Sequence, residues 1–337
     1  MNIDLTKSPD RDVFERLFVG IFGRTPNDAD VKMVATAVQS PSDLWHYLKH
    51  ASVTEEAQSN KARQATAPLF VPPGHYYSPI VNLADLNREA IANASQPLDI
   101  ALDSDAMLEA LRAITAHYQP GQFPPSQSED RFHLDNGFFG IGDAIILSGM
   151  IAEKRPAQII EVGSGYSSAV ILDTLDRLDL QTPCTFVEPY PERLHGLLRA
   201  ADHTRVTIHE SPVQQVPLGV FEALNSGDMV FFDTTHVSKT GSDVNHEIFE
   251  ILPRLKAGVL IHFHDMFNKF EYPLNWIFDH SRSWNEIYTL RAFLMNNDAY
   301  EILILSDYLA HTRGSEALAI CHDFMINPGG ALWLVKK

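Results

Sequence analysis

The sequence predicts an α/β protein built on a doubly wound, mostly parallel sheet, with a small all-α domain in front of it. From residue 157 onward, short apolar strands alternate with helices, which is typical of a parallel sheet covered on both faces. The chain has 337 residues, a length that suggests about two domains. With 45% hydrophobic and 20% charged residues, it has the composition of a globular protein.

The expected elements of the sheet domain, residues 131–337, follow one another in a regular order. A buried helix over 141–153 comes first, and strands and helices then alternate. The expected strands are 158–162, 185–188, 205–208, 229–233, 258–264, 300–305 and 331–335. The expected helices between them are 168–178, 192–201 and 245–255.

Residues 1–65 are predicted to form a separate helical domain. Val13, Phe14, Leu17, Phe18 and Ile21 recur at helical spacing and form one apolar face. Reactive side chains do not cluster there, so we expect packing or docking rather than chemistry.

Residues 66–130 are expected to supply a linker, a lid and helices over the active site. The segment around Tyr76 and Tyr77 follows a Pro-Pro-Gly break and cannot be a long helix. Its two aromatic rings are candidates for a substrate-pocket wall, and a packed loop is an equal alternative.

Charge and cysteine content exclude several classes of partner. The chain has 43 acidic and 26 basic residues, a formal net charge of −17. A surface this acidic disfavours nucleic acids and anionic membranes, which attract basic proteins. The two cysteines, Cys184 and Cys321, are too few for a disulfide framework and fit a reducing compartment. The N-terminus does not read as a secretory signal and no apolar run approaches about 18 residues, so we expect a cytoplasmic protein.

A glycine-rich turn follows the first expected strand. Gly163, Ser164 and Gly165 stand where that strand gives way to a helix, so the backbone can turn sharply and bring helix N–H groups near a ligand. Glu188 lies 27 residues after Glu161, at the end of the next strand, where a carboxylate can accept hydrogen bonds from ribose hydroxyls. A dinucleotide site would prefer a third glycine or an alanine where Ser168 stands.

This order of strand, Glu-x-Gly-x-Gly, helix, strand and acidic residue resembles the class I S-adenosylmethionine-dependent methyltransferases. The resemblance implies a Rossmann-like fold of seven strands that ends in a reversed hairpin. It places Glu161 near the methionine amino end of the cofactor, Gly163, Ser164 and Gly165 in the cofactor loop, and Glu188 on the ribose. Gln214 follows the third strand, where such enzymes contact adenine, although an ordinary surface glutamine explains it as well.

Acidic and histidine side chains gather at the ends of two later strands. Asp233 and His236 follow the fourth strand, and His264 and Asp265 follow the fifth. In open α/β sheets ligands bind at the carboxyl ends of strands, so these four side chains are candidates for the reaction centre, with Asp233 also beside the cofactor. Each also has a structural explanation, such as a cap or a loop residue, and His262 is expected to be a core residue.

The segment from Phe232 to Asn245 resembles the macrolide-sugar O-methyltransferases, which carry an Asp-x-x-His segment and a later acidic pair. That resemblance implies Asp233 and Asp265 as metal ligands and His236 as the general base. His264 stands where those relatives have an acid and would complete the metal set here. Magnesium or manganese is favoured over iron, and a metal-free site that only orients substrate and base remains open.

Two further features bear on the substrate. Tyr272 and Trp276 lie in an aromatic loop after the fifth strand and are candidates to stack on a sugar or aromatic ring, with core packing as the alternative. Residues 17–28 resemble a small helical domain attached to some glycan-modifying enzymes, which favours a carbohydrate or a glycosylated molecule.

Together these observations predict a cytoplasmic S-adenosylmethionine-dependent O-methyltransferase that acts on a hydroxyl of a sugar or natural product. Methyl transfer to nitrogen or a carboxylate, or other sulfonium chemistry, is the first alternative. A related branch resembles cephalosporin hydroxylases, in which the cluster would hold iron. A non-catalytic nucleotide-binding scaffold is the third. The expected partner is a small molecule or glycan, and a homo-oligomer is left open.

Overall fold

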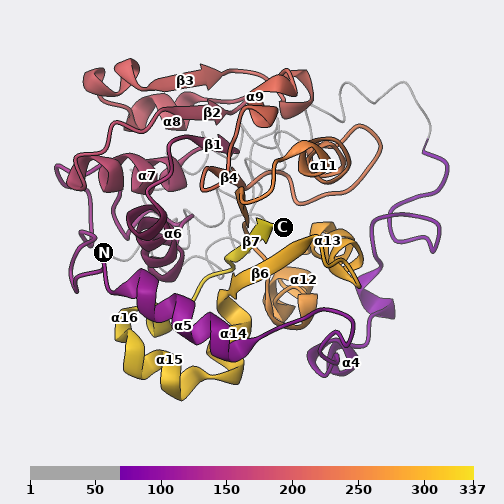
Figure 1. Ribbon diagram of the computed structural model, residues 1–337. Coiled ribbons are helices and arrows are strands. Elements are labelled where there is room, and N and C mark those ends of the chain that lie inside the picture. The colour runs from indigo at the N-terminus through magenta and orange to yellow at the C-terminus, as the bar shows by residue number, and fades with distance from the viewer. Residues whose placement is uncertain (1–68) are drawn as a thin grey trace, which may run out of the picture. The chain divides into compact units, whose positions relative to one another are not determined.

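The computed structural model describes residues 69–337 (Figure 1). Contacts divide the chain into two compact units, residues 1–72 and 73–337, and the sheet belongs to the second. The helical domain expected over residues 1–65 lies outside the described residues. Across residues 69–337, no helix is both long enough and apolar enough to cross a membrane.

A seven-stranded sheet with the order β3-β2-β1-β4-β5-β7-β6 forms the centre of the second unit. Strands β1 to β5 are parallel, while β7 runs antiparallel to both β5 and β6. The prediction of a doubly wound, mostly parallel seven-stranded sheet with a reversed final hairpin is confirmed. The strands are β1 Ile159–Val162, β2 Cys184–Val187, β3 Val206–His209, β4 Met229–Phe232, β5 Leu260–Phe263, β6 Tyr300–Leu305 and β7 Leu332–Lys336.

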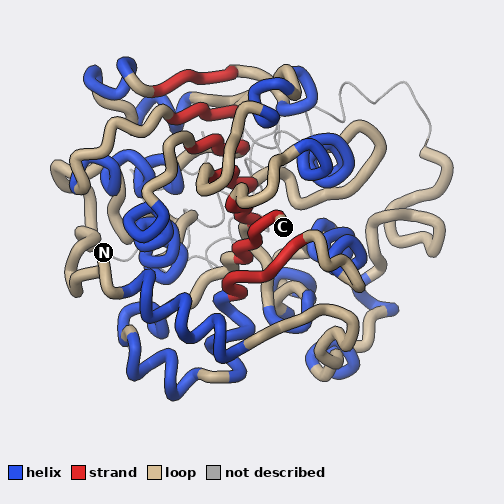
Figure 2. The backbone as a smooth tube through the Cα atoms, in the orientation of Figure 1, coloured by secondary structure: helices blue, strands red, loops and turns tan. Residues whose placement is uncertain are grey.

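Helices lie on both sides of the sheet (Figure 2). Those before and between the first strands are α4 Arg88–Ala92, α5 Ser104–Thr115, α6 Ile141–Lys154, α7 Tyr166–Arg177, α8 Glu192–Leu197 and α9 Gly219–Glu222. Those after β4 are α10 Asp243–His246, α11 Leu252–Arg254, α12 Leu274–Phe278, α13 Glu286–Leu294, α14 Ser306–Thr312, α15 Gly314–Ile320 and α16 His322–Ile326. A π-helical turn, Glu247–Ile251, joins α10 to α11, and short 3₁₀ turns are Leu83–Asp85, Ala200–Thr204, Val213–Gln215 and Asn268–Phe270.

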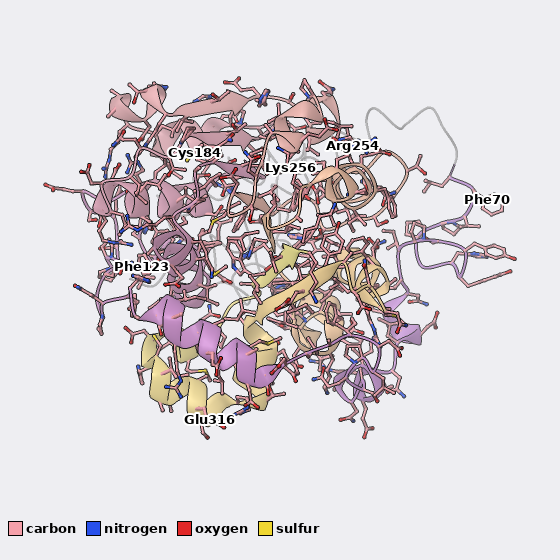
Figure 3. The ribbon with its side chains drawn as sticks, viewed as in Figure 1. Phe70, Phe123, Cys184, Arg254, Lys256 and Glu316 are labelled. Atoms are coloured by element: carbon pink, nitrogen blue, oxygen red, sulfur yellow. The ribbon has the colours of Figure 1, made fainter. Side chains whose placement is uncertain are left out.

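The core explains why the central strands read as continuous apolar runs. Every residue of β1, β4 and β5 is buried, as expected for strands covered by helices on both faces. Helix α6 is buried from Gly142 to Ala152, which matches its apolar sequence. Cys184, labelled in Figure 3, belongs to β2 and is buried, and both it and Cys321 are free thiols.

The register of the central strands positions the site. Val162 of β1 pairs with Phe232 of β4, which pairs with Phe263 of β5, so the three strands end together. Backbone N–H groups of the next residues continue the pattern: Asp233 donates to the Val162 carbonyl at 2.9 Å, and His264 donates to the Phe232 carbonyl at 3.0 Å. The loops after these strands therefore meet at one edge of the sheet.

Candidate functional site

The glycine turn packs directly against the end of β4. Gly163 has a φ of +81°, and a Cβ atom there would lie 1.7 Å from the carbonyl oxygen of Asp233. Only glycine combines this left-handed backbone with so close an approach. The turn that follows β1 and the acidic residue that follows β4 thus share one surface.

Glu161 lies under this turn, fully buried in β1. The Ser168 hydroxyl donates to its Oε2 atom and accepts the N–H of Gly165 at 2.9 Å. Its Oε1 atom has no hydrogen-bond partner within residues 69–337. Burial raises the pKa of Glu161 to about 8, although nearby serine hydroxyls oppose that shift. A buried carboxyl with an unused oxygen can receive a cationic or N–H donor group of a ligand.

Glu188 joins the same turn from the end of β2. Its Oε2 atom accepts the N–H of Ser164 at 3.0 Å, and its Oε1 atom accepts the N–H of Tyr190 at 2.9 Å. Burial raises the pKa of this carboxyl. Each oxygen retains a second lone pair that can accept a ligand hydroxyl. Gln214 is exposed, and its side-chain amide donates to the Gly241 carbonyl at 2.9 Å.

His236 is the centre of a second cluster. Its Nδ1 atom lies 2.8 Å from Glu286 Oε2, and its Nε2 atom lies 3.3 Å from Asp233 Oδ1 and 3.5 Å from Asp265 Oδ2. The imidazole is buried, as is the Glu286 carboxyl, whereas Asp233 and Asp265 are partly exposed. One ring nitrogen is thus held by a buried acid while the other faces two carboxylates at the strand ends.

The charges in this cluster shift one another's pKa values. Burial alone would lower the pKa of His236, but Asp233 and Glu286 outweigh it and hold that pKa well above its usual range. Burial would raise the pKa of Asp233, but His264 and His236 lower it to about 2. Burial raises the pKa of Glu286 despite its bond to His236. In the absence of a ligand, these interactions favour the charged form of the His236 imidazole and the ionised form of Asp233.

The backbone at this cluster is strained in two places. His236 and Asp265 have φ angles of 58° and 59°, in the left-handed region that such residues rarely adopt. The carbonyl of His236 accepts the N–H groups of Asn285 and Glu286 at 3.0 and 3.1 Å. The start of α13 thus anchors the loop after β4 through backbone and side chain alike. Strain that the surrounding structure maintains is typical of functional sites.

The three residues with metal-binding geometry include His236, whereas the sequence suggested His264 in its place. Ligand atoms of Asp233, His236 and Asp265 all lie within 4.8 Å of one another. His264 is buried and stacks on Phe139, with ring centroids 5.1 Å apart, and its Nε2 atom lies 3.7 Å from Asp265 Oδ1. The cluster found in the described residues therefore takes its histidine from the β4 loop.

Glu286 escaped the sequence analysis because it lies fifty residues after His236 and belongs to no recognised motif. A signal was nevertheless present. Ile287, Leu290 and Leu294 form the buried face of α13, and Glu286 shares that burial. An acid on the buried face of an amphipathic helix needs a partner, and here the partner is His236.

Aromatic rings extend the cluster away from the sheet. Trp284 lies against His236, with ring centroids 4.4 Å apart, and contacts Tyr272 and Trp276 at 6.0 and 5.6 Å. Tyr272 is buried, and its hydroxyl accepts the N–H of Ile287 at 3.3 Å. The two predicted substrate residues of this loop are therefore connected to His236 through Trp284.

Tyr76 and Tyr77 occupy a different environment. They are 80% and 63% exposed, and ring contacts join them to His75 and to each other. Their role as a substrate wall stays a prediction.

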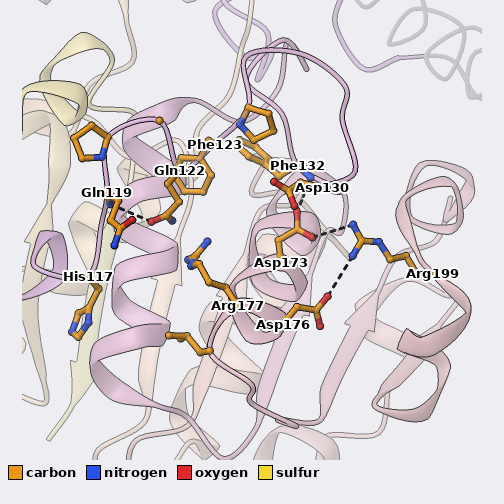
Figure 4. Close-up of a pocket in the computed structure, with 14 residues that line it drawn as sticks. His117, Gln119, Gln122, Phe123, Asp130, Phe132, Asp173, Asp176, Arg177 and Arg199 are labelled. Carbon is orange, nitrogen blue, oxygen red and sulfur yellow. Dashed lines mark hydrogen bonds and ion pairs between the residues drawn. The ribbon is translucent and has the colours of Figure 1, made fainter.

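A separate cavity lies at the C-terminal end of α7 (Figure 4). It measures about 760 Å³ and is bordered by Asp173, Asp176 and Arg177, with Arg199 paired to both aspartates at 3.9 and 3.6 Å. Because α7 begins at the glycine turn, its far end faces away from the strand ends that carry His236. The cavity is therefore separate from the candidate active site.

Residues 160–266 match a family model described as a methyltransferase domain. An uncharacterized protein from Archaeoglobus fulgidus is 29% identical over 164 residues, covering 45% of this chain and 73% of that relative. Among solved structures, the methyltransferase PaMTH1 of Podospora anserina, bound to SAH, is similar at 14% identity with a TM-score of 0.38, covering 74% of this chain and 92% of that one. The plantazolicin methyltransferase BpumL in complex with SAH is similar at 12% identity with a TM-score of 0.38, covering 69% and 95%.

The family match begins in β1 and ends just after β5, so it spans the strands that carry the glycine turn, Glu188, Asp233 and Asp265. Residues 160–266 are therefore similar to a methyltransferase domain, and they lie within a seven-stranded Rossmann-like sheet.

Proposed function

We propose that this protein transfers the methyl group of S-adenosylmethionine to a hydroxyl of a sugar or natural product, with His236 as the general base. The single observation that carries this proposal is the imidazole held at Nδ1 by Glu286 while Nε2 faces the ends of β4 and β5. A buried acid that fixes one ring nitrogen leaves the other in a defined orientation for proton transfer.

The residues around the glycine turn fit the proposed cofactor. The unused Oε1 atom of Glu161 suits the ammonium of a methionine moiety, and Glu188 retains acceptor capacity for ribose hydroxyls. Gly163 and Gly165 let the backbone approach a ligand between these two acids. Gln214 stays a candidate for the adenine contact.

Bound S-adenosylmethionine would supply an electrophilic methyl group on a sulfonium sulfur. The acceptor oxygen would take that methyl group, and the electron pair of the carbon–sulfur bond would stay on sulfur. The hydroxyl proton passes to Nε2 of His236, whose neutral form is required for this step. Asp233 and Asp265 flank Nε2, stabilise the imidazolium that forms and orient the hydroxyl.

Metal-assisted transfer is the second candidate, favoured by the convergence of Asp233, His236 and Asp265 within 4.8 Å. Two carboxylates and an imidazole suit manganese or another divalent metal, and magnesium through the carboxylates alone. A metal would lower the pKa of the acceptor hydroxyl and fix its position. His236 would then be a metal ligand together with Asp233 and Asp265. Alternatively, His264 would complete the ligand set and His236 would lie beside the metal.

Calorimetric titration of SAH, with and without a chelator, tests the cofactor site first. Binding near micromolar strength supports the proposal, and a folded, cofactor-free protein that binds neither SAH nor S-adenosylmethionine would contradict it. A loss of affinity on chelation favours the metal candidate.

The base is tested by His236→Ala. This variant should lose about 100- to 10,000-fold in turnover while it keeps its affinity for SAH. His322→Ala changes an exposed histidine and serves as the control. Unchanged turnover of the His236 variant would remove the imidazole from the mechanism.

A further inference from the structure

One cation near the proposed acceptor site lies between two tryptophans. The Cζ atom of Arg282 lies 4.0 Å from the ring centroid of Trp276 and 4.3 Å from that of Trp284. The two indole rings are nearly perpendicular, at 86°, and the backbone N–H of Arg282 donates to the Trp276 carbonyl at 2.9 Å. The guanidinium is therefore held in place by the faces of both rings.

The N–H groups at the edges of this guanidinium have no partner among the described residues. A guanidinium carries five N–H donors, yet within residues 69–337 the side chain of Arg282 makes no hydrogen bond or ion pair with another group. It is half-buried, and Asp265 attracts it without forming an ion pair. The two ring faces attract the positive charge of Arg282, but they cannot accept hydrogen bonds from its in-plane N–H groups. Those N–H groups can therefore donate to a planar acceptor such as a carboxylate.

A cavity of about 160 Å³ opens beside Arg282. Its lining includes Arg282, Trp284 and Asn285 together with apolar Leu86, Ile91 and Ile277. Trp284 also contacts the imidazole of His236, and the N–H of Asn285 donates to the His236 carbonyl. The cavity and the proposed base are thus connected through two successive residues.

We propose that Arg282 binds a carboxylate of the methyl acceptor, so that the enzyme acts on hydroxylated carboxylic acids. This inference rests on the proposed function for the acceptor hydroxyl at His236. The carboxylate would pair with the guanidinium edge in the cavity, and the ring of the acceptor would pass over Trp284 toward the imidazole.

The local charges favour a carboxylate over a phosphate. One guanidinium faces the cavity, while Asp265 and Glu271 place two acids nearby, the latter bonded to the Tyr288 hydroxyl that borders the cavity. A single negative charge is balanced by one Arg, whereas a phosphate dianion would be repelled by the surrounding carboxylates. The carboxylate also matches the two-pronged geometry of the guanidinium.

Matched ligands test this inference directly. Gallate is pyrogallol with one added carboxylate. Glucuronate is glucose with a carboxylate in place of the primary alcohol. Titrated into SAH-saturated protein, at least one acid should bind about tenfold or more tightly than its neutral counterpart. Arg282→Gln should remove that preference, Arg282→Lys should keep part of it, and exposed Arg112→Gln should leave it unchanged.

Affinity for SAH, measured on every variant, separates the two proposals. If SAH fails to bind the unmodified protein, the proposed function fails, while the acids can still be titrated against Arg282→Gln. If SAH binds every variant equally and no acid is preferred over its neutral counterpart, or if Arg282→Gln keeps the preference, the carboxylate assignment is wrong. An unfolded Arg282→Gln would lose SAH affinity as well, in which case Arg282→Lys decides: an undiminished preference contradicts the assignment.

Discussion

The Nδ1 atom of His236 lies 2.8 Å from Oε2 of Glu286, and this contact joins the loop after β4 to the first turn of α13. Two backbone hydrogen bonds from α13 to the His236 carbonyl reinforce it. The imidazole is therefore fixed in both position and orientation. Its remaining nitrogen faces Asp233 and Asp265, at the edge of the sheet where parallel strands usually bind ligands.

Replacement of this acid should damage catalysis without affecting the cofactor. Glu286→Gln removes the negative charge but keeps the shape, so His236 loses part of the attraction that raises its pKa. We expect turnover to fall about 100-fold and the midpoint of the pH profile to move to lower pH. SAH affinity should not change.

Exposed Glu316→Gln is the matched control for this variant. A Glu286→Gln enzyme with normal turnover and an unshifted pH midpoint would mean that the contact only stabilises the fold.

The unmodified enzyme should be most active at alkaline pH. The base must be neutral, and its pKa in the free protein is raised well above 6.5 because Asp233 and Glu286 outweigh the effect of burial. As pH rises through that pKa, the proton is lost and kcat/KM should increase, falling about tenfold for each pH unit below it. Initial rates at saturating cofactor measure this, and a rate that is flat or falls from pH 6 to 9 would contradict the role of His236.

The parts of the site that local sequence determines could be predicted. The apolar runs of β1, β4 and β5 and the glycine turn are set by neighbouring residues, and the strand order of a doubly wound sheet brings their ends together. Asp233 and Asp265 were therefore expected near Gly163. These three residues lie close together because β1, β4 and β5 end at the same edge of the sheet, as the predicted parallel arrangement implies.

Glu286 and Arg282 could not be predicted in the same way. Both act through side chains that reach the site only when the segment after β5 folds back over it, and no short-range pattern specifies that path. Glu286 gave a weak signal as an acid on an apolar helix face. Arg282 gave no signal in the sequence. The two tryptophans near it, Trp276 and Trp284, are as typical of a protein core as of a ligand site.

The close approach at the glycine turn makes a second pair of variants informative. A Cβ at position 163 would lie 1.7 Å from the Asp233 carbonyl, whereas a Cβ at Gly227, with a similar φ of +89°, would meet nothing within 4 Å. Gly227→Ala should cost about 1 kcal/mol of unfolding free energy through backbone strain alone. Gly163→Ala should cost about 3 kcal/mol or more, since β1 and β4 must separate.

Urea denaturation measures both free energies, and methyl transfer assays show whether Asp233 has moved. Equal destabilisation by the two substitutions would mean that the turn adjusts without disturbing β4.

The buried Glu161 should make the ligand-free protein less stable as pH rises. Burial raises its folded pKa from 4.5 to about 8, so folding favours the protonated acid. That contribution is complete below pH 4.5 and is lost as pH rises toward 8, by up to about 1.4 kcal/mol per pH unit. The unfolding free energies of the unmodified protein and Glu161→Gln should be similar at acidic pH. Near pH 8 the Glu161→Gln variant should be the more stable of the two. Parallel curves across this range would mean that the carboxyl is ionised when folded.

The same carboxyl should couple cofactor binding to pH. If the ammonium of SAH pairs with Glu161, the ionised acid is the binding form, and binding must release the proton that the ligand-free protein holds. Affinity should therefore rise by up to tenfold per pH unit from pH 6 to about 8 and then level off. Glu161→Gln should bind SAH more weakly and lose this pH dependence, while exposed Glu316→Gln should retain it.

Calorimetry in buffers of different ionisation enthalpy counts the released proton. No release at pH 7 from the unmodified protein would place the ammonium elsewhere in the site.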